Sequence, residues 1–163
     1  MESSKRRGFT TIEMIAVMVV FGITAALAGP RFYQLVTAVS TRTAADRLAR
    51  AAELARANAV RFGRDAELRI DQTGMRFWVQ VDTTVNVSGV KDTIGSIQDL
   101  SNSKVTMALT VAGATKTSAI VCFDVRGVRS TRSPCDVGIA SILFSQSTHS
   151  DSVQVTSLGK VVR

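Results

Sequence analysis

The amino-terminal part of the chain is dominated by one apolar run. Residues 9–29 carry a single charge, Glu13, and they follow three cations at positions 5–7 and a glycine at position 8. At about 1.5 Å per helical residue the run would extend about 31 Å, which is close to the hydrocarbon thickness of a bilayer. The pattern predicts a transmembrane helix over residues 9–29.

Beyond Pro30 the periodicity becomes that of an amphipathic helix. Apolar residues, most of them alanine, recur at spacings of three and four. They are Ala45, Leu48, Ala52, Ala55, Ala59 and Phe62. Gly63 follows as a typical helix stop. We therefore expect one helix from about Phe9 to Phe62, bent at Pro30, whose second part packs this small-residue stripe against a domain.

The other faces of this helix carry several arginines. They are Arg42, Arg47, Arg50, Arg56 and Arg61. Asp46 stands four residues before Arg50, and Glu53 stands three residues before Arg56, spacings at which opposite charges attract weakly on a helix surface. The pattern indicates a solvated face with weak ion pairs, and a filament-packing or anion-binding face is the alternative.

After Arg64 the pattern changes to the alternation of β-strands. Residues 66–70 and 75–81 alternate on either side of an Asp-Gln-Thr-Gly turn, which predicts a β-hairpin with Trp78 opposite to its apolar face. Residues 82–104 are rich in Thr, Ser, Asn, Asp and Gly and predict a long loop. Further strands are expected at residues 105–111, 119–125, 138–145 and 152–156.

These elements predict an α+β fold in which a long helix precedes an antiparallel β-sheet. With 163 residues, the chain has room for one membrane-anchored helix and one domain of about 100 residues. Only 6% of the residues are aromatic, so the core must consist mainly of Val, Ile, Leu and Ala. The expected segments are residues 1–8, the transmembrane residues 9–29, the amphipathic residues 30–63 and the β-rich residues 64–163.

The two cysteines, Cys122 and Cys135, lie in the β-rich segment. In a domain exported past the membrane they would meet an oxidising compartment, where a disulfide is expected. Closing this loop would stabilise the fold by about 3 kcal/mol on the loop-entropy argument. Two buried free thiols are the alternative.

The sequence contains no pattern typical of catalysis. His149 is the one histidine, it lies in a Ser/Thr-rich segment where we expect it to be exposed, and no carboxylate cluster stands near it. A metal site is therefore not expected. Neither a nucleophile elbow nor a phosphate-binding loop is present. We expect no enzyme activity and no cofactor.

The basic cluster, Gly8, Phe9 and Glu13, followed by the apolar run, together resemble the class III signal of type IV pilins and of type II secretion pseudopilins. The resemblance implies that a prepilin peptidase cuts after Gly8 and methylates the new amino group of Phe9. It also implies that Glu13 sets the register between subunits during assembly. Pro30 stands where this family places a helix-kinking proline.

Two other interpretations apply to the same residues. An ordinary secretory signal also has a basic start and an apolar core, but it is cut after the core at small residues, which residues 25–28 could supply. Glu13 could serve only as a local helix cap, because Thr10 stands three residues before it as in a capping box. A helix cap alone does not explain why cations and a glycine stand at the head of the run.

Residues 120–127 resemble the F-D-x-x-G segment of the H-type pseudopilin and FimT group, with Phe123, Asp124 and Gly127 as the matching residues. The closing residues 153–163 are similar to that group as well. The resemblance implies a pilin-like fold in a single-pass protein of the bacterial inner membrane, with its carboxyl-terminal domain in the periplasm. The charge rule favours this orientation only weakly, because Arg31 and Arg42 lie beyond the apolar run.

Two assembly roles follow from the resemblance. The first is a minor pseudopilin of a type II secretion pseudopilus, whose partners are other pseudopilins and an exported protein. The second is a minor type IV pilin that binds DNA for uptake, which would use a basic patch. The candidate residues are Arg126, Arg129, Arg132, Lys160 and Arg163.

Phosphate contacts from such a patch would give affinity that depends on salt and not on base sequence. Its loop lacks the interleaved aromatic residues that suit single strands. Removing residues 1–8 would lower the net charge from +7 to +5, a surplus that suits anionic partners and plain solubility equally. The same cations could simply solvate a long loop.

Overall fold

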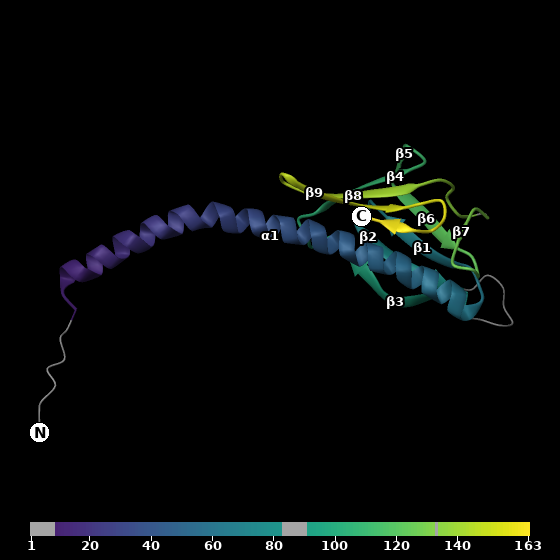
Figure 1. Cartoon of the computed structure of the whole chain (residues 1–163), viewed down its shortest axis with the longest axis horizontal. Helices are drawn as coiled ribbons and strands as arrows, with labels where there is room; N and C mark the ends of the chain where they lie inside the picture. The colour runs from purple at the N-terminus through teal and green to yellow at the C-terminus, as the bar shows by residue number, and fades with distance from the viewer. Residues whose placement is uncertain (1–8, 83–90, 133) are drawn as a thin grey trace, which may run out of the picture. The chain divides into compact units, whose positions relative to one another are not determined.

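The computed structural model describes residues 9–82, 91–132 and 134–163, apart from the side chain of Pro30. Within these residues the chain forms the helix α1 (Thr11–Phe62) and ten strands (Figure 1). The strands are β1 (Ala66–Asp71), β2 (Arg76–Val81), β3 (Asp92–Asp99), β4 (Thr106–Val111), β5 (Ala114–Lys116), β6 (Ser118–Phe123), β7 (Arg129–Ser130), β8 (Ala140–Gln146), β9 (His149–Val155) and β10 (Val161–Val162). The chain divides into two compact units, with the boundary inside α1 between Val36 and Thr37.

The first unit contains the amino-terminal part of α1. This helix continues through Pro30, so the proline does not end it. Its apolar side chains lie exposed along the whole segment up to Val36. Among the described residues, α1 is the one helix that is long and apolar enough to cross a membrane by length and composition.

The second unit begins with the amphipathic part of α1. Ala45, Leu48, Ala52, Ala55 and Ala59 are all fully buried, as the spacing predicts. Phe62, placed on the same stripe from the sequence, is instead 39% exposed. It occupies the last position of α1, where its ring lies under the guanidinium of Arg61 at 5.4 Å.

The carboxyl end of α1 is closed by Gly63 in a left-handed conformation, with a φ of 63°. The Arg64 N–H donates to the Ala59 carbonyl, and the Gly63 N–H donates to the Val60 carbonyl. These two bonds satisfy carbonyl groups that a helix end leaves without partners. Gly63 is therefore the helix stop that the sequence predicts.

The strands form two five-stranded antiparallel sheets, where the sequence analysis expected a single sheet. The first has the order β3-β2-β1-β6-β7 and the second the order β10-β9-β8-β4-β5. The β1–β2 hairpin is confirmed, with Leu68 opposite Val79 and Ile70 opposite Phe77. Trp78 is only half-buried, because it projects from the face of β2 opposite to Phe77 and Val79.

The prediction of a loop at residues 82–104 was wrong for the second half of this segment, which contains β3. This strand lies at the end of its sheet, paired to β2 alone, and most of its residues are exposed. An edge strand with both faces largely in solvent has no need of apolar alternation, so its polar sequence has the composition of a loop. The short strands β5, β7 and β10 were missed as well, and the other strand predictions are confirmed within two or three residues at their ends.

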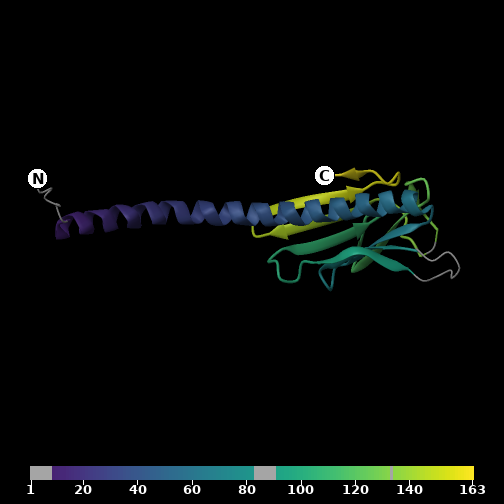
Figure 2. The ribbon, with the colours of Figure 1, turned by 90° about the horizontal axis from the view of Figure 1, so that it is seen from below.

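The core of the second unit lies between α1 and the two sheets. Figures 1 and 2 show the part of α1 after Thr37 running along the strands. The largest buried side chains are those of Phe77, Phe123 and Phe144, and most of the others are Val, Ile, Leu and Ala. One contiguous cluster joins all of them to the alanine stripe of the helix.

Two ties, one polar and one covalent, hold the segment after β6 to the sheets. Arg129 in β7 is only 7% exposed, and its guanidinium donates to the carbonyls of Val155 in β9 and of Asp136. Burial lowers the pKa of Arg129, and the nearby Asp136 opposes this effect. Asp136 accepts the Ile120 N–H at 2.8 Å and pairs with Lys116; these contacts outweigh burial and lower its pKa.

The second tie is covalent, because Cys122 in β6 is bonded to Cys135. In the full-length protein purified from an oxidising compartment, thiol labelling after denaturation without reductant is expected to find no free cysteine. Reduction should lower the free energy of unfolding by about 3 kcal/mol in a urea titration, since the closed loop constrains the unfolded chain. The Cys122→Ala/Cys135→Ala variant is the control and should not respond to reductant. Labelling of both cysteines without reduction would contradict the prediction.

Candidate functional site

The exposed apolar side chains of the first unit form its most distinctive surface. They include Ile12, Val20, Phe21, Leu27 and Phe32, each more than half exposed. An apolar surface of this extent is unfavourable in water, so it requires lipid or another protein chain as a neighbour. This surface is suited to anchoring and assembly.

Small residues interrupt this surface at Gly22, Ala26 and Gly29. A Cβ atom added to Gly22 or Gly29 would meet nothing within 4 Å. The helix backbone is therefore open to close approach from outside at these positions, which is the property of helices that pack tightly in membranes.

Glu13 lies in the first turn of α1 and is exposed. Its N–H donates to the Thr10 hydroxyl at 3.4 Å, and its carboxylate accepts the Thr10 N–H at 3.5 Å. These are the two hydrogen bonds of a capping box, and both are long. The cap therefore forms within one chain, without a neighbouring subunit. Phe9 is 75% exposed, whereas Gly8 and the bond predicted to be cut lie outside the described residues.

The five cations predicted to form a basic patch do not lie together on one exposed surface. Arg129 is buried between the sheets and cannot reach an external phosphate. Arg163 pairs with Asp151 at 2.6 Å and with Asp46, and the Asp151 carboxylate raises its pKa. The sequence could not predict that Arg129 is buried and that Arg163 is paired, because their partners lie in other segments of the chain.

The other three cations remain exposed. Arg126 has a side chain 79% exposed and an ion pair with Asp124 at 3.0 Å, and Arg132 and Lys160 are exposed as well. Burial opposes ionisation of Asp124, but bonds from the Val128 N–H and Arg126 outweigh it and lower the pKa. The turns of Arg126 and Lys160 approach each other, since a Cβ added to Gly159 would lie 3.4 Å from the Gly127 carbonyl oxygen.

Neither of the two ion pairs that the sequence analysis expected on the helix is found among the described residues. Asp46 pairs with Arg163, which comes from the carboxyl end of the chain, in place of Arg50. Within the described residues Glu53 and Arg56 form no ion pair. His149, expected in an exposed loop, begins β9 and is half-buried, with its Nδ1 3.5 Å from the Thr37 hydroxyl.

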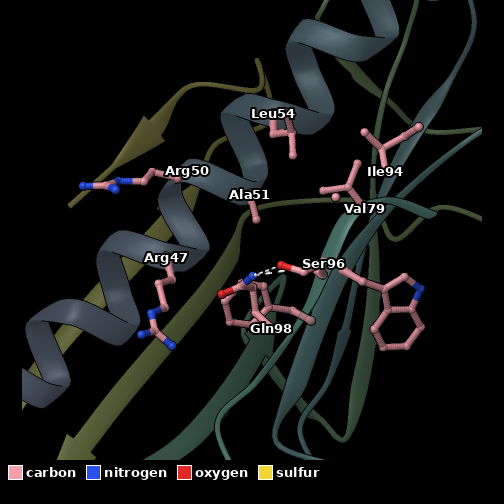
Figure 3. A pocket seen from close by; sticks show the side chains of 11 residues that line it. Arg47, Arg50, Ala51, Leu54, Val79, Ile94, Ser96 and Gln98 are labelled. Atoms are coloured by element: carbon pink, nitrogen blue, oxygen red, sulfur yellow. Dashed lines mark hydrogen bonds between the residues drawn. The ribbon is translucent and has the colours of Figure 1, made fainter.

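One feature was missed entirely from the sequence. A groove of about 330 Å³ lies between α1 and the strands β2 and β3. One side of the groove is formed by β3 (Figure 3), and the loop-like composition of residues 82–104 did not predict this strand. In the described part of the chain, no three His, Cys, Asp or Glu residues are grouped as they would be to hold a metal ion.

Comparison with protein families gives two matches. Residues 44–159 match the family of type II transport protein GspH. Residues 3–29 match the prokaryotic N-terminal methylation motif, which includes Gly8, Phe9 and Glu13. A comparison with curated proteins found no match.

Comparison with solved structures found two crystal structures of the type IV minor pilin FimU from Pseudomonas aeruginosa strain PAO1. The first, in space group P21, is 14% identical, with a TM-score of 0.53 over 76% of this chain and 87% of FimU. The second, in space group P65, is 13% identical, with a TM-score of 0.50 over 74% of this chain and 90% of FimU. At these identities the similarity concerns the fold alone.

The fold of a long amino-terminal helix followed by antiparallel sheets is thus that of a pilin, as the sequence predicts. The family match spans most of the second unit, and the methylation motif spans the start of the apolar helix. Together they cover well over half of the residues. The chain belongs to the GspH family of type II transport proteins, as a pilin-like member with an N-terminal methylation motif.

Proposed function

We propose that this protein is a structural subunit of a type II secretion pseudopilus. Residues 1–8 serve as a leader, residues 9–29 cross the inner membrane, and the β-rich domain stands in the periplasm until the subunit joins the filament. The observation that carries this proposal is the match of residues 44–159 to the type II transport protein GspH. The exposed apolar helix supports it, since such a surface needs lipid before assembly and protein after it.

The proposal gives Glu13 two successive partners. Before cleavage, the Glu13 carboxylate accepts a long hydrogen bond from the Thr10 N–H. Cleavage after Gly8 would create a methylated ammonium at Phe9, and a bond between opposite charges in a water-poor environment is stronger than a neutral one. We propose that the carboxylate then pairs with such an ammonium on its own or an adjacent subunit and so fixes the register between helices.

Helix packing would cover the surface that the membrane no longer covers. The open backbone at Gly22 and Gly29 allows neighbouring helices to approach closely. The partners in this proposal are other pseudopilins and the prepilin peptidase that cuts the leader. Catalysis has no part in it.

The Glu13→Val substitution tests the assembly role. It should leave the protein in the membrane, because removing a carboxylate makes the apolar run easier to insert. It should lower the amount of the protein in sheared filaments by about tenfold or more, since the charge pair that sets the register is lost. Quantitative immunoblotting of filament and membrane fractions measures both effects.

Processing is the control for this experiment. The intact mass of the wild type and of the variant should both correspond to a chain that begins at a methylated Phe9. Wild-type incorporation of the processed variant would mean that Glu13 acts only as a helix cap.

A second candidate role is DNA binding by a minor type IV pilin, favoured by the three cations that remain exposed. Arg126, Arg132 and Lys160 are exposed, and the turns beside Arg126 and Lys160 approach each other. Two solved structures of similar fold are of a type IV minor pilin. The burial of Arg129 and the ion pairs of Arg163 reduce the patch from five cations to three. Any affinity for duplex DNA should therefore be weak.

The DNA-binding role predicts a mobility shift of duplex DNA at low salt by the detergent-solubilised full-length protein. The Arg126→Ala/Arg132→Ala/Lys160→Ala variant should bind more weakly, with a slope of log affinity against log salt reduced by about 0.9 for each lost phosphate contact. The control is Arg47→Ala/Arg50→Ala, which removes charge elsewhere. No shift at high micromolar wild-type protein would exclude this role, and equal loss in the control would mean that only net charge matters.

A further inference from the structure

The uncovered part of α1 carries two charged side chains of opposite sign. Glu13 lies in the first turn of the helix, and Arg31 lies just beyond the apolar run. Between Phe9 and Val36 the sequence has no other charged residue. Both side chains are exposed, and neither forms an ion pair with another described residue. In the described part of the chain, each of these charges therefore lacks an opposite partner.

Glu13 and Arg31 lie on the same side of α1. The helix is continuous from Thr11 to Phe62, and Arg31 stands 18 residues after Glu13. At about 3.6 residues per turn this separation corresponds to about five complete turns, and at about 1.5 Å per residue it spans about 27 Å. The two charges cannot meet across this distance within one helix. They can meet when a second helix lies alongside the first, displaced by about five turns.

The surface around Glu13 has room for an arginine side chain. Glu13 lines an open hollow of about 370 Å³ on α1, together with Ala16, Val17, Val20, Phe21 and Thr24. The Thr24 hydroxyl donates to the carbonyls of Val20 and Phe21 within its own helix. An arginine has an apolar stem and a charged end. The stem would pack on the apolar lining of this hollow, and the guanidinium would reach the Glu13 carboxylate.

Assembly would change the surroundings of both charges. In a membrane, an arginine two residues beyond the apolar run reaches the headgroup region with its long side chain. In a filament other helices replace the lipid, and a charge without a partner is costly in such a water-poor contact. Glu13 has a proposed partner in the ammonium group of Phe9. For Arg31, the apolar segment supplies one kind of acidic partner, which is Glu13 of another copy.

We propose that Arg31 pairs with Glu13 of a second copy of this chain, whose α1 lies parallel to the first and is displaced by about five turns; this inference rests on the proposed assembly role. A guanidinium binds a carboxylate through two parallel hydrogen bonds, so the contact fixes both the displacement and the faces that meet. The two oxygens of the Glu13 carboxylate can accept a bond from the Phe9 ammonium as well.

Two other partners fit the arrangement less well. A lipid phosphate would pair with Arg31 in the membrane, but it would not remain beside the helix after lipid is replaced by protein. A different protein would need a carboxylate at the same height on a parallel apolar helix. A second copy supplies this carboxylate because Glu13 and Arg31 lie on one face of the same helix. Lipid and a different protein are therefore outcomes that the experiments must distinguish.

The first experiment compares Arg31→Gln with the wild type in sheared filaments. The variant should be about tenfold or more depleted, because removing one partner leaves the other charge uncompensated in the contact. Arg31→Lys keeps a cation and should retain most of the incorporation. The control is Arg50→Gln, since Arg50 is an exposed arginine of the covered part of α1 and extends away from the groove beside β3 (Figure 3). Immunoblots of filament and membrane fractions measure these effects.

A double variant tests whether the two charges act together. In a Glu13→Gln background, Arg31→Gln should cause no further loss from filaments, because the pair is already broken. Wild-type incorporation of Arg31→Gln would overturn the pairing, and so would a further loss in the double variant. Equal depletion of Arg31→Gln from the membrane fraction would assign Arg31 to lipid and would overturn the pairing as well.

The second experiment uses two full-length copies with different epitope tags, one with Val17→Cys and one with Leu35→Cys. These exposed positions lie one turn beyond Glu13 and Arg31 and have the same displacement of 18 residues. The native cysteines are bonded to each other and should not react. A short bis-maleimide should join the two copies in sheared filaments. Tyr33→Cys in place of Leu35→Cys is the control and should give no such product, because two residues are about 200° apart around a helix.

Filaments that contain both copies but give no product with both tags would overturn the second-copy assignment. Products that join these positions only to a different protein would overturn it too. Either result would leave the effect of Glu13→Val, and with it the proposed function, unchanged. Absence of the wild-type protein from filaments would instead contradict the proposed function.

Discussion

The packing of the second part of α1 against the strands is the constraint on which the rest of the structure depends. Ala45, Ala52, Ala55 and Ala59 are fully buried there, and they belong to the same apolar cluster as the large side chains of the strands. The large side chains of the core come from the sheets, and Leu48 is the largest that the stripe contributes. A bulkier residue on the stripe would force the sheets apart, which typically costs about 1–3 kcal/mol.

The apolar surface of this helix has two parts with different surroundings. From Thr37 onward the chain's own strands cover it, whereas the apolar side chains before Val36 remain exposed. Because the chain covers only one of these two apolar surfaces, the other must be covered by lipid or by other protein chains. This dependence is the physical basis of the proposed assembly role, in which we propose that the charge of Glu13 within the uncovered part sets the register between subunits.

The sequence predicted those features that depend on local pattern. Helical spacing identified the alanine stripe, alternation identified the β1–β2 hairpin, and Gly63 marked the end of the helix. The features that it missed depend on contacts between distant segments. The strand β3 has a polar sequence because it lies at an edge, and the burial of Arg129 depends on carbonyl groups more than five residues away along the chain. The candidate groove beside β3 was missed for the same reason.

The central claim is that α1 has one part covered by its own domain and one part covered by other subunits. Photo-leucine, a diazirine analogue of leucine, tests it directly at Leu27, which is 72% exposed, and at Leu48, which is fully buried. In sheared filaments position 27 should give crosslinks to other subunits, and position 48 should give only crosslinks within the chain. Crosslinks between subunits from position 48, or none from position 27 in filaments that contain the protein, would contradict the account.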